Sequence, residues 1–436
     1  MLREPSEGEL SMEAEIHERE AERGPRRGVL VLMPKDARTA TGPVSVWLTA
    51  AGWAEAAQEA HGAAWMVTPS GILDGGEARL LATSAPRATL PPAAGWKRLI
   101  PTTLKTLRKD VLSWRHARSF REAGLEGPWE PEGPLWIWHH HEPFHDSGFV
   151  AKRRFGCPVV VFVDAPTVWE SGQWGVKRPG WGRLLERFGE VAQLRDADLI
   201  ACVTEEVANE VIRLGGPRER VIVTPTAVAL DRFNEDVSGA EVRARYGLEG
   251  RTVVGWVGTF HKFHGLDLLV EAYAAVERER RDTSLLLVGD GQDRPRIEAL
   301  VDSFGLRQVV FAGAVPQDQV PSHLAAMDVA SVVDPGTGSF HYSPLKLKEY
   351  LACGRAVVAP ASGQVARYVA DGTHALLVPA GDAPALTRAL LRLVDDPGLR
   401  SSLGAAGNAL VRETGTWAHQ LRTVEDALTS RGWVSA

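Results

Sequence analysis

The segment SPLKLKEYLACGRAVVAP, from Ser343 to Pro360, decides the fold of the C-terminal half of the chain. A turn of small residues precedes a predicted helix, which carries the acidic residue Glu349 among leucines and ends at Gly354. An apolar strand, Ala356–Ala359, follows at once. The N–H groups at the start of such a helix can bind a diphosphate, and the carboxylate can accept hydrogen bonds from two ribose hydroxyls. The segment therefore predicts a ribose and phosphate site.

The composition limits the classes of protein to which the chain can belong. Its 436 residues predict two domains, and 44% hydrophobic with 24% charged residues is typical of a globular protein. The net charge of -6 argues against nucleic acid as a partner. Three distant cysteines argue against a disulfide framework or a zinc site. With no signal peptide expected in residues 1–27 and no long apolar run, we expect a cytoplasmic protein.

Short apolar runs alternate with amphipathic stretches from Gly28 onward, after a charged tail, residues 1–27, that we expect to be disordered. This alternation predicts an α/β protein with parallel, doubly wound sheets. We expect strands of the first sheet at Val29–Met33, Trp136–Trp138, Val159–Val163, Leu199–Val203 and Val221–Val223. We expect strands of the second at Thr252–Val257, Ser284–Val288, Val309–Ala312, Val329–Val332, Ala356–Ala359 and Ala375–Val378.

Two glycine-containing loops follow strands of the second series. In the first, Gly258 would let the backbone approach a phosphate, and Lys262 or His264 could add positive charge. The second, Gly289–Gly291, could approach a nucleotide base. Either loop could also be a simple turn, because glycine-rich turns after strands are common.

Histidines and an aspartate follow two strands of the first series. The run His139–His141, with His145, has the composition of a metal site, but adjacent side chains diverge, so we favour a cleft-lining loop. Asp164 follows the strand Val159–Val163, where a carboxylate would face the cleft between the domains, although it could simply form a turn before Pro166.

The stretch Lys97–Arg121 interleaves many cations with apolar residues. It could bind an anionic membrane surface or an acidic substrate. The interpretation that we favour is a solvated helix face.

Taken in order, these segments resemble the GT-B glycosyltransferases, most closely the retaining family 4 enzymes. CPVVVFVDAPTVWE, starting at Cys157, is similar to the family's "PvVvtvH" strand and loop, and GWVGTFHKFHGLDLLVEAY, starting at Gly255, to its "vGrlxxxKGxdxLieA" segment. The segment at Ser343 is similar to its nucleotide-sugar motif. The resemblance implies two Rossmann-like domains facing a cleft, residues 28–228 for the acceptor and 229–415 for the nucleotide sugar. Residues 416–436 would form a helix that crosses back to the N-terminal domain.

The resemblance implies retaining transfer of a sugar from a GDP- or UDP-linked donor, with no metal and no other cofactor. Glu349 matches the second glutamate of the family's pair, and the first falls at His341. The family's arginine and lysine fall at Thr259 and His264, which makes Lys262 the expected substitute cation. We expect catalytic roles for Lys262, Asp164 and His141. We expect donor contacts from Gly42, Gly258, Thr259, His264, Gly289, Val315, His341, Ser343, Pro344, Leu345, Lys346 and Glu349.

The acceptor is expected to be a small molecule of specialised metabolism, such as an antibiotic intermediate. The alternatives are a cell-wall, lipid or polysaccharide acceptor, a nucleotide-sugar epimerase, and an inactive sugar-nucleotide binding protein. Membrane association is not the favoured expectation, and the sequence does not predict an oligomeric state.

Overall fold

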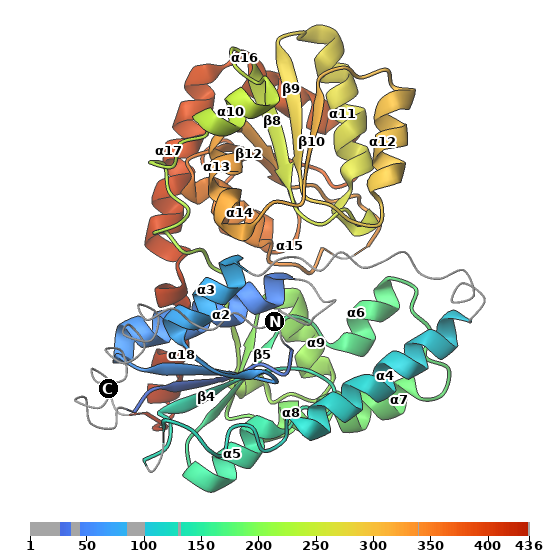
Figure 1. Cartoon of the computed structure of the whole chain (residues 1–436). Coiled ribbons are helices and arrows are strands. Elements are labelled where there is room, and N and C mark those ends of the chain that lie inside the picture. Colours follow the sequence, from blue (N-terminus) through green and yellow to red (C-terminus); the bar gives the residue numbers. More distant parts are fainter. Residues whose placement is uncertain (1–26, 36–43, 85–100, 130–131, 339, 435–436) are drawn as a thin grey trace, which may run out of the picture.

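The computed structural model describes residues 27–35, 44–84, 101–129, 132–338 and 340–434. These residues form two α/β units, one above the other in Figure 1. The expected α/β fold is therefore confirmed. The predicted donor residue Gly42, like residues 1–26 of the predicted tail, lies outside the described residues.

The described part of the N-terminal unit contains a seven-stranded sheet in the order β3-β2-β1-β4-β5-β6-β7. Two of these strands, β2 (Ala64–Thr68) and β3 (Gly71–Asp74), were not predicted, and β3 pairs antiparallel to β2. Only two residues separate them, and β3 is largely exposed, so it lacks the continuous apolar run of a buried parallel strand. The predicted strands are β1 (Val29–Leu32), β4 (Trp136–His140), β5 (Val159–Val163), β6 (Leu199–Cys202) and β7 (Val221–Val223).

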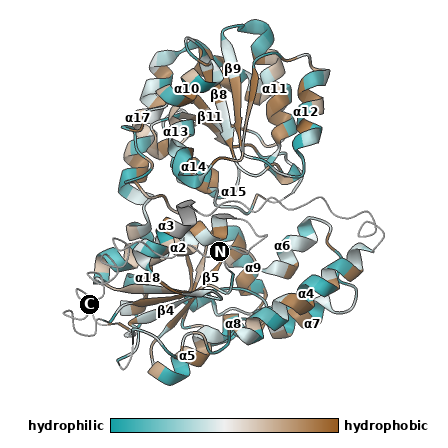
Figure 2. Cartoon of the chain, viewed as in Figure 1, coloured by the Kyte–Doolittle hydropathy of each residue, from teal (hydrophilic) through white to brown (hydrophobic). Residues whose placement is uncertain are grey.

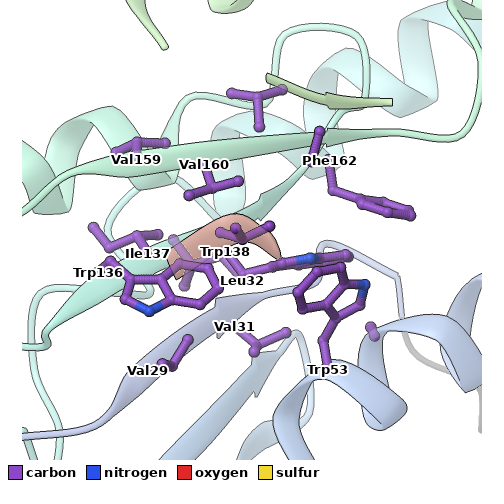
Figure 3. Close-up of a cluster of buried hydrophobic side chains, with 14 of the residues drawn as sticks. Val29, Val31, Leu32, Trp53, Trp136, Ile137, Trp138, Val159, Val160 and Phe162 are labelled. Carbon is purple, nitrogen blue, oxygen red and sulfur yellow. The ribbon is translucent and has the colours of Figure 1, made fainter. Parts of the chain in front are cut away.

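The core of this unit is rich in aromatic side chains (Figure 3). The ring of Trp138 on β4 stacks on Phe162 of β5, with centroids 5.0 Å apart, and Trp53 lies 6.5 Å from Trp138. Helices cover both faces of the parallel strands, which explains why strands such as β5 are apolar throughout. The helices are α2 (Val44–His61), α3 (Gly75–Ser84), α4 (Thr102–Ser119), α5 (Ser147–Phe155), α6 (Thr167–Gln173), α7 (Gly182–Leu185), α8 (Val191–Asp196) and α9 (Glu205–Arg213).

The C-terminal unit contains six parallel strands in the order β10-β9-β8-β11-β12-β13. All six lie within one residue of their predicted bounds. They are β8 (Thr252–Val257), β9 (Thr283–Val288), β10 (Val309–Gly313), β11 (Val329–Ser331), β12 (Ala356–Pro360) and β13 (Leu376–Val378). The helices are α10 (Ala240–Tyr246), α11 (Leu266–Glu279), α12 (Arg294–Ser303), α13 (Val320–Ala325), α14 (Leu345–Ala352), α15 (Gly363–Tyr368) and α16 (Ala383–Asp395).

The last helix returns the chain to the N-terminal unit, as predicted, and it is preceded by a helix that was not predicted. Helix α17 (Pro397–Thr414) runs along the C-terminal unit, and α18 (Trp417–Thr429) packs against α2 and β6 (Figure 1). Trp417 lies so close to Gly52 of α2 that a Cβ on Gly52 would be 2.4 Å from the indole ring. In the described ranges, no helix is both long and apolar enough to cross a lipid bilayer.

We expect Gly52→Ala to lower the free energy of unfolding by about 1–3 kcal/mol, because the added methyl group overlaps the Trp417 ring. In an open helical position the same exchange would favour the helix by roughly 1 kcal/mol. Gly172→Ala in α6 is the matched control, since nothing lies within 4 Å of the Cβ there. Urea unfolding measures both variants, and equal stability of Gly52→Ala and the parent protein would contradict the packing argument.

Candidate active site

Loops that follow strands of the two sheets meet between the domains, and hydrogen bonds join the domains there. The Thr204 hydroxyl, after β6, donates to the carbonyl oxygen of His341 at 3.0 Å. Thr226, after β7, donates from its N–H to the Ser343 hydroxyl at 3.1 Å and from its own hydroxyl to the Ser343 carbonyl at 2.8 Å. Ser343, a predicted donor contact, therefore lies at the junction of the domains, directly before α14.

Helix α14 brings Lys346 and Glu349 together one turn apart, both partly buried. The Lys346 ammonium lies 4.0 Å from the centroid of the Trp256 ring on β8. Gly258 follows β8 with φ +152°, and a Cβ there would be 2.8 Å from the Lys346 Nζ. Lysine, glycine backbone and carboxylate therefore share one small region at the start of α14, where the sequence predicted a phosphate and ribose site.

The two charged groups of α14 have strongly shifted pKa values. Burial lowers the pKa of Lys346 to about 7, against the opposing effect of Glu349. Burial raises the pKa of Glu349 to about 7, although the positive charges of Arg232 and Lys346 favour its ionised form. Lys346 makes no side-chain hydrogen bond or ion pair with any described residue, so its ammonium is available to an anion.

We expect kcat/KM for the donor to peak near pH 7. Lys346 carries its charge below its pKa and Glu349 above its own, so the fraction of enzyme with both charges falls on either side of this pH. A profile from about pH 5 to 9 measures this. The acid limb should flatten in Glu349→Gln and the alkaline limb in Lys346→Met, and an unchanged profile in both variants would contradict the assignment.

The loop after β8 contains three other predicted donor-site residues, Thr259, Lys262 and His264. Lys262 and Thr259 are exposed at its surface. His264 packs 5.7 Å from the Trp256 ring, and burial next to Lys346 lowers its pKa to about 2. His264 is therefore neutral near neutral pH and supplies no positive charge there.

Two further predicted donor contacts lie at other places in the C-terminal domain. Gly289, after β9, has its backbone packed against Gly258. Val315 packs against the C-terminal core.

The predicted histidine loop is largely wrong, because His139 and His140 are the last two residues of the buried strand β4. The His139 ring stacks on His145 with centroids 4.0 Å apart, and its Nε2 lies 3.3 Å from the Gln193 amide oxygen. No group of three or more ligand-type side chains in the described residues could hold a metal ion.

His140, rather than the predicted His141, is the histidine of this run that contacts Asp164. Its Nε2 lies 3.1 Å from the Asp164 carboxylate, while its Nδ1 lies 3.6 Å from Glu142. About a third of the Asp164 side chain is exposed, so the carboxylate remains accessible at the end of β5. His141 is buried, and burial lowers its pKa to about 4. Neighbouring strand residues point to opposite faces, so the sequence alone could not choose between these histidines.

Glu170 of α6 is a second site residue that the sequence did not predict. Its carboxylate lies 3.4 Å from the Nε2 of His341, which is the position of the family's first glutamate. The Trp169 ring contacts the same histidine with centroids 4.7 Å apart. Glu170, from the N-terminal domain, therefore places a carboxylate next to His341, the position at which the family has a glutamate in the C-terminal domain.

Aromatic residues from both domains also pack against one another between the domains. Trp174, at the end of α6, stacks on Phe263 with centroids 5.3 Å apart and planes 11° apart. Its indole N–H donates to the Tyr342 hydroxyl at 3.1 Å. Helix α6 thus connects the N-terminal sheet to both donor-side loops of the C-terminal domain.

Comparison with known proteins agrees with this geometry. Residues 74–227 match the Glycosyl transferase 4-like domain, and residues 251–396 match Glycosyl transferases group 1. Alpha-D-kanosaminyltransferase of Streptomyces kanamyceticus is 28% identical over 310 residues, covering 64% of this chain and 77% of the relative. D-inositol 3-phosphate glycosyltransferase of Kribbella flavida is 31% identical over 325 residues, covering 71% of this chain and 72% of the relative.

The fold also matches a solved structure, Anabaena HepE in complex with UDP and glucose. The two chains are 17% identical, align over 92% of this chain and 99% of that chain, and have a TM-score of 0.63. The chain is therefore a transferase that belongs to the group 1 glycosyltransferases and has their two-domain GT-B fold.

Proposed function

We propose that the protein transfers a sugar from a UDP- or GDP-linked donor to a small acceptor of specialised metabolism, with retention of configuration. The observation that carries the proposal is the pairing of Lys346 and Glu349 at the start of α14, beside the Gly258 backbone. This combination suits a diphosphate next to a ribose. A relative named 2-deoxystreptamine glucosyltransferase, from Streptomyces kanamyceticus and 35% identical over 212 residues, supports the acceptor class. The neighbour with bound UDP and glucose supports the donor class.

In the proposed reaction the bond between the anomeric carbon and the diphosphate oxygen breaks, and negative charge develops on the leaving diphosphate. The Lys346 ammonium, held over Trp256 in a partly buried site, stabilises that charge more strongly than an exposed cation could. The acceptor hydroxyl bonds to the same face of the anomeric carbon, and its proton passes to the diphosphate. The lysine supplies the positive charge, so the proposed reaction uses no metal.

We further propose that Glu170 and His341 contact the donor sugar together. The family's first glutamate is replaced by His341, and a carboxylate is restored beside it by α6. A carboxylate and an imidazole can accept and donate hydrogen bonds to sugar hydroxyls. Because Glu170 belongs to the N-terminal domain, this half of the donor site exists only while the domains are together.

Asp164→Asn is expected to lower kcat by about 10²-fold, because a neutral amide binds the acceptor hydroxyl more weakly than the carboxylate does and orients it less well for attack. The donor dissociation constant should stay unchanged, since donor binding is assigned to α14. Asp146→Asn, which alters a half-exposed carboxylate paired with Arg121, is the control. Unchanged turnover in Asp164→Asn would make Asp164 only a turn-forming residue.

The proposed function is tested by incubating the protein with UDP- and GDP-sugars, with and without a panel of aminocyclitol and other polyol acceptors. A glycosylated acceptor with the anomeric configuration of the donor supports it, and nuclear magnetic resonance of the product reads that configuration. A new sugar nucleotide formed without acceptor would instead indicate an epimerase. Stabilisation by UDP or GDP without turnover of any acceptor would indicate a binding protein.

A lipid-linked acceptor is the second candidate, favoured by the exposed apolar residues of α4 described below. Product that partitions into organic solvent would distinguish it from a water-soluble glycoside.

A further inference from the structure

Helix α4 buries two polar side chains and exposes apolar as well as charged ones, unlike an ordinary amphipathic surface helix. Its inward face consists of Thr106, Asp110 and Ala117, all buried. The Asp110 carboxylate accepts hydrogen bonds from the Arg178 guanidinium at 2.8 Å and the Trp181 indole at 2.9 Å. The polar groups of α4 are therefore satisfied inside the protein.

The outward face of α4 carries Leu104, Leu107, Val111 and Trp114, spaced three, four and three residues apart along one side of the helix. Their exposed fractions are 55%, 37%, 42% and 41%. We call these four residues the α4 stripe. Figure 2 shows the apolar residues of α4 alternating with strongly hydrophilic ones.

The apolar surface continues beyond α4. Phe188, in the π-helical turn Glu186–Glu190, is 60% exposed, and it lines the same hollow as Trp114. Leu184 of α7 is also exposed. The α4 stripe and Phe188 thus form one exposed apolar area through Trp114, and such an area marks an interaction surface.

Cations surround this area although the whole chain has a net charge of -6. The Arg118 guanidinium lies 5.8 Å from the Trp114 ring, and that of Arg187 lies 5.4 Å from the Phe188 ring. The carboxylates that line the hollow are Asp146, which pairs with Arg121, and Asp196, while Glu186 lies in the π-helical turn and the exposed Glu122 follows α4. Further exposed cations are Lys105, Arg108, Lys109, Arg115 and Arg183.

We propose that the α4 stripe and Phe188 dock the enzyme on an anionic lipid bilayer. Leucine, valine and aromatic side chains would enter the interface between headgroups and acyl chains, while the surrounding arginines and lysines bind lipid phosphates. Tryptophan is enriched at that depth of a bilayer. The proposal concerns the outer face of the N-terminal domain and does not rest on the identity of the donor or acceptor.

The test is sedimentation of the full chain with phosphatidylcholine vesicles, with and without phosphatidylglycerol. We expect binding only to the anionic vesicles and weaker binding at high salt. Arg108→Ala and Arg115→Ala should each lower the partition coefficient about fivefold, and the double variant Leu107→Ser with Val111→Ser should abolish binding. Phe304→Ser and Arg388→Ala change exposed residues of the C-terminal domain and should bind like the parent.

Two controls test whether each variant is folded. Its melting temperature, and its rate of sugar transfer to a water-soluble acceptor without vesicles, should match those of the parent. No binding of the parent to anionic vesicles, or equal binding of the parent and the Leu107→Ser, Val111→Ser variant, would overturn the proposal. The surface would instead bind a second copy of the chain if the parent protein did not bind vesicles but formed a dimer in solution, and if the Leu107→Ser, Val111→Ser variant were a monomer.

Discussion

Replacing Lys346 with methionine is expected to lower kcat for sugar transfer by about 10²–10³-fold, the usual loss when one group that stabilises developing negative charge is removed. Methionine keeps a similar length and can still pack on Trp256, so the fold should persist. The loss should appear mainly in kcat, because the charge on the diphosphate grows as the bond to the sugar breaks. Steady-state kinetics at saturating donor, with circular dichroism as the folding control, measures it.

Lys262→Met is the matched comparison. Lys262 is exposed, and the attraction between an exposed cation and a phosphate is weakened by water, so we expect a loss below about tenfold. Lys262 is also the cation that the sequence predicted. If Lys262→Met lost more activity than Lys346→Met, the leaving group would be stabilised from the loop after β8, and the assignment of Lys346 would fail.

Glu349→Gln is expected to lower kcat/KM for the donor by about 10–150-fold, the effect of losing hydrogen bonds to a charged acceptor worth about 1.5–3 kcal/mol. We propose that the carboxylate accepts both ribose hydroxyls, in the ground state as in the transition state. The loss should therefore appear chiefly as a higher KM and a weaker affinity for the free nucleoside diphosphate. Calorimetric titration with UDP and GDP measures the second quantity.

Glu241→Gln in α10 is the control for this variant, because it changes an exposed carboxylate paired with Arg245 on the helix surface. Such pairs contribute little, so its kinetics should match the parent. If nucleotide affinity were equal in Glu349→Gln and the parent, Glu349 would have a structural role beside Arg232 rather than a role in binding ribose.

The sequence predicted the parallel strands well and the edge of the first sheet poorly. Buried parallel strands such as Val159–Val163 are covered by helices on both faces, so they are apolar throughout and easy to recognise. The hairpin of β2 and β3 is an antiparallel edge with one exposed strand, Gly71–Asp74, which has no such signature. The return of α18 was expected only from the family resemblance.

At the site, the sequence motif from Ser343 to Pro360 predicted helix α14 correctly, because the residues of the motif are consecutive in the chain. It could not find contacts made between distant segments. The Lys346 ammonium over Trp256 joins residues 90 positions apart, and Glu170 lies 171 residues from His341. Likewise, His140 rather than His141 meets Asp164 because strand geometry decides which side chain faces which way. Gly42 stays a prediction, because it lies outside the described residues.

The contact between Glu170 and His341 also bears on domain exchange. A chimera can keep the C-terminal domain of one glycosyltransferase and take its N-terminal domain from another. The aim of such an exchange is to change the acceptor and keep the donor. Here the exchange would remove Glu170 and Trp169 from His341, and with them the proposed sugar contacts. A chimera built on residues 229–436 of this chain would then keep its nucleotide but change its sugar, unless α6 were transplanted with it.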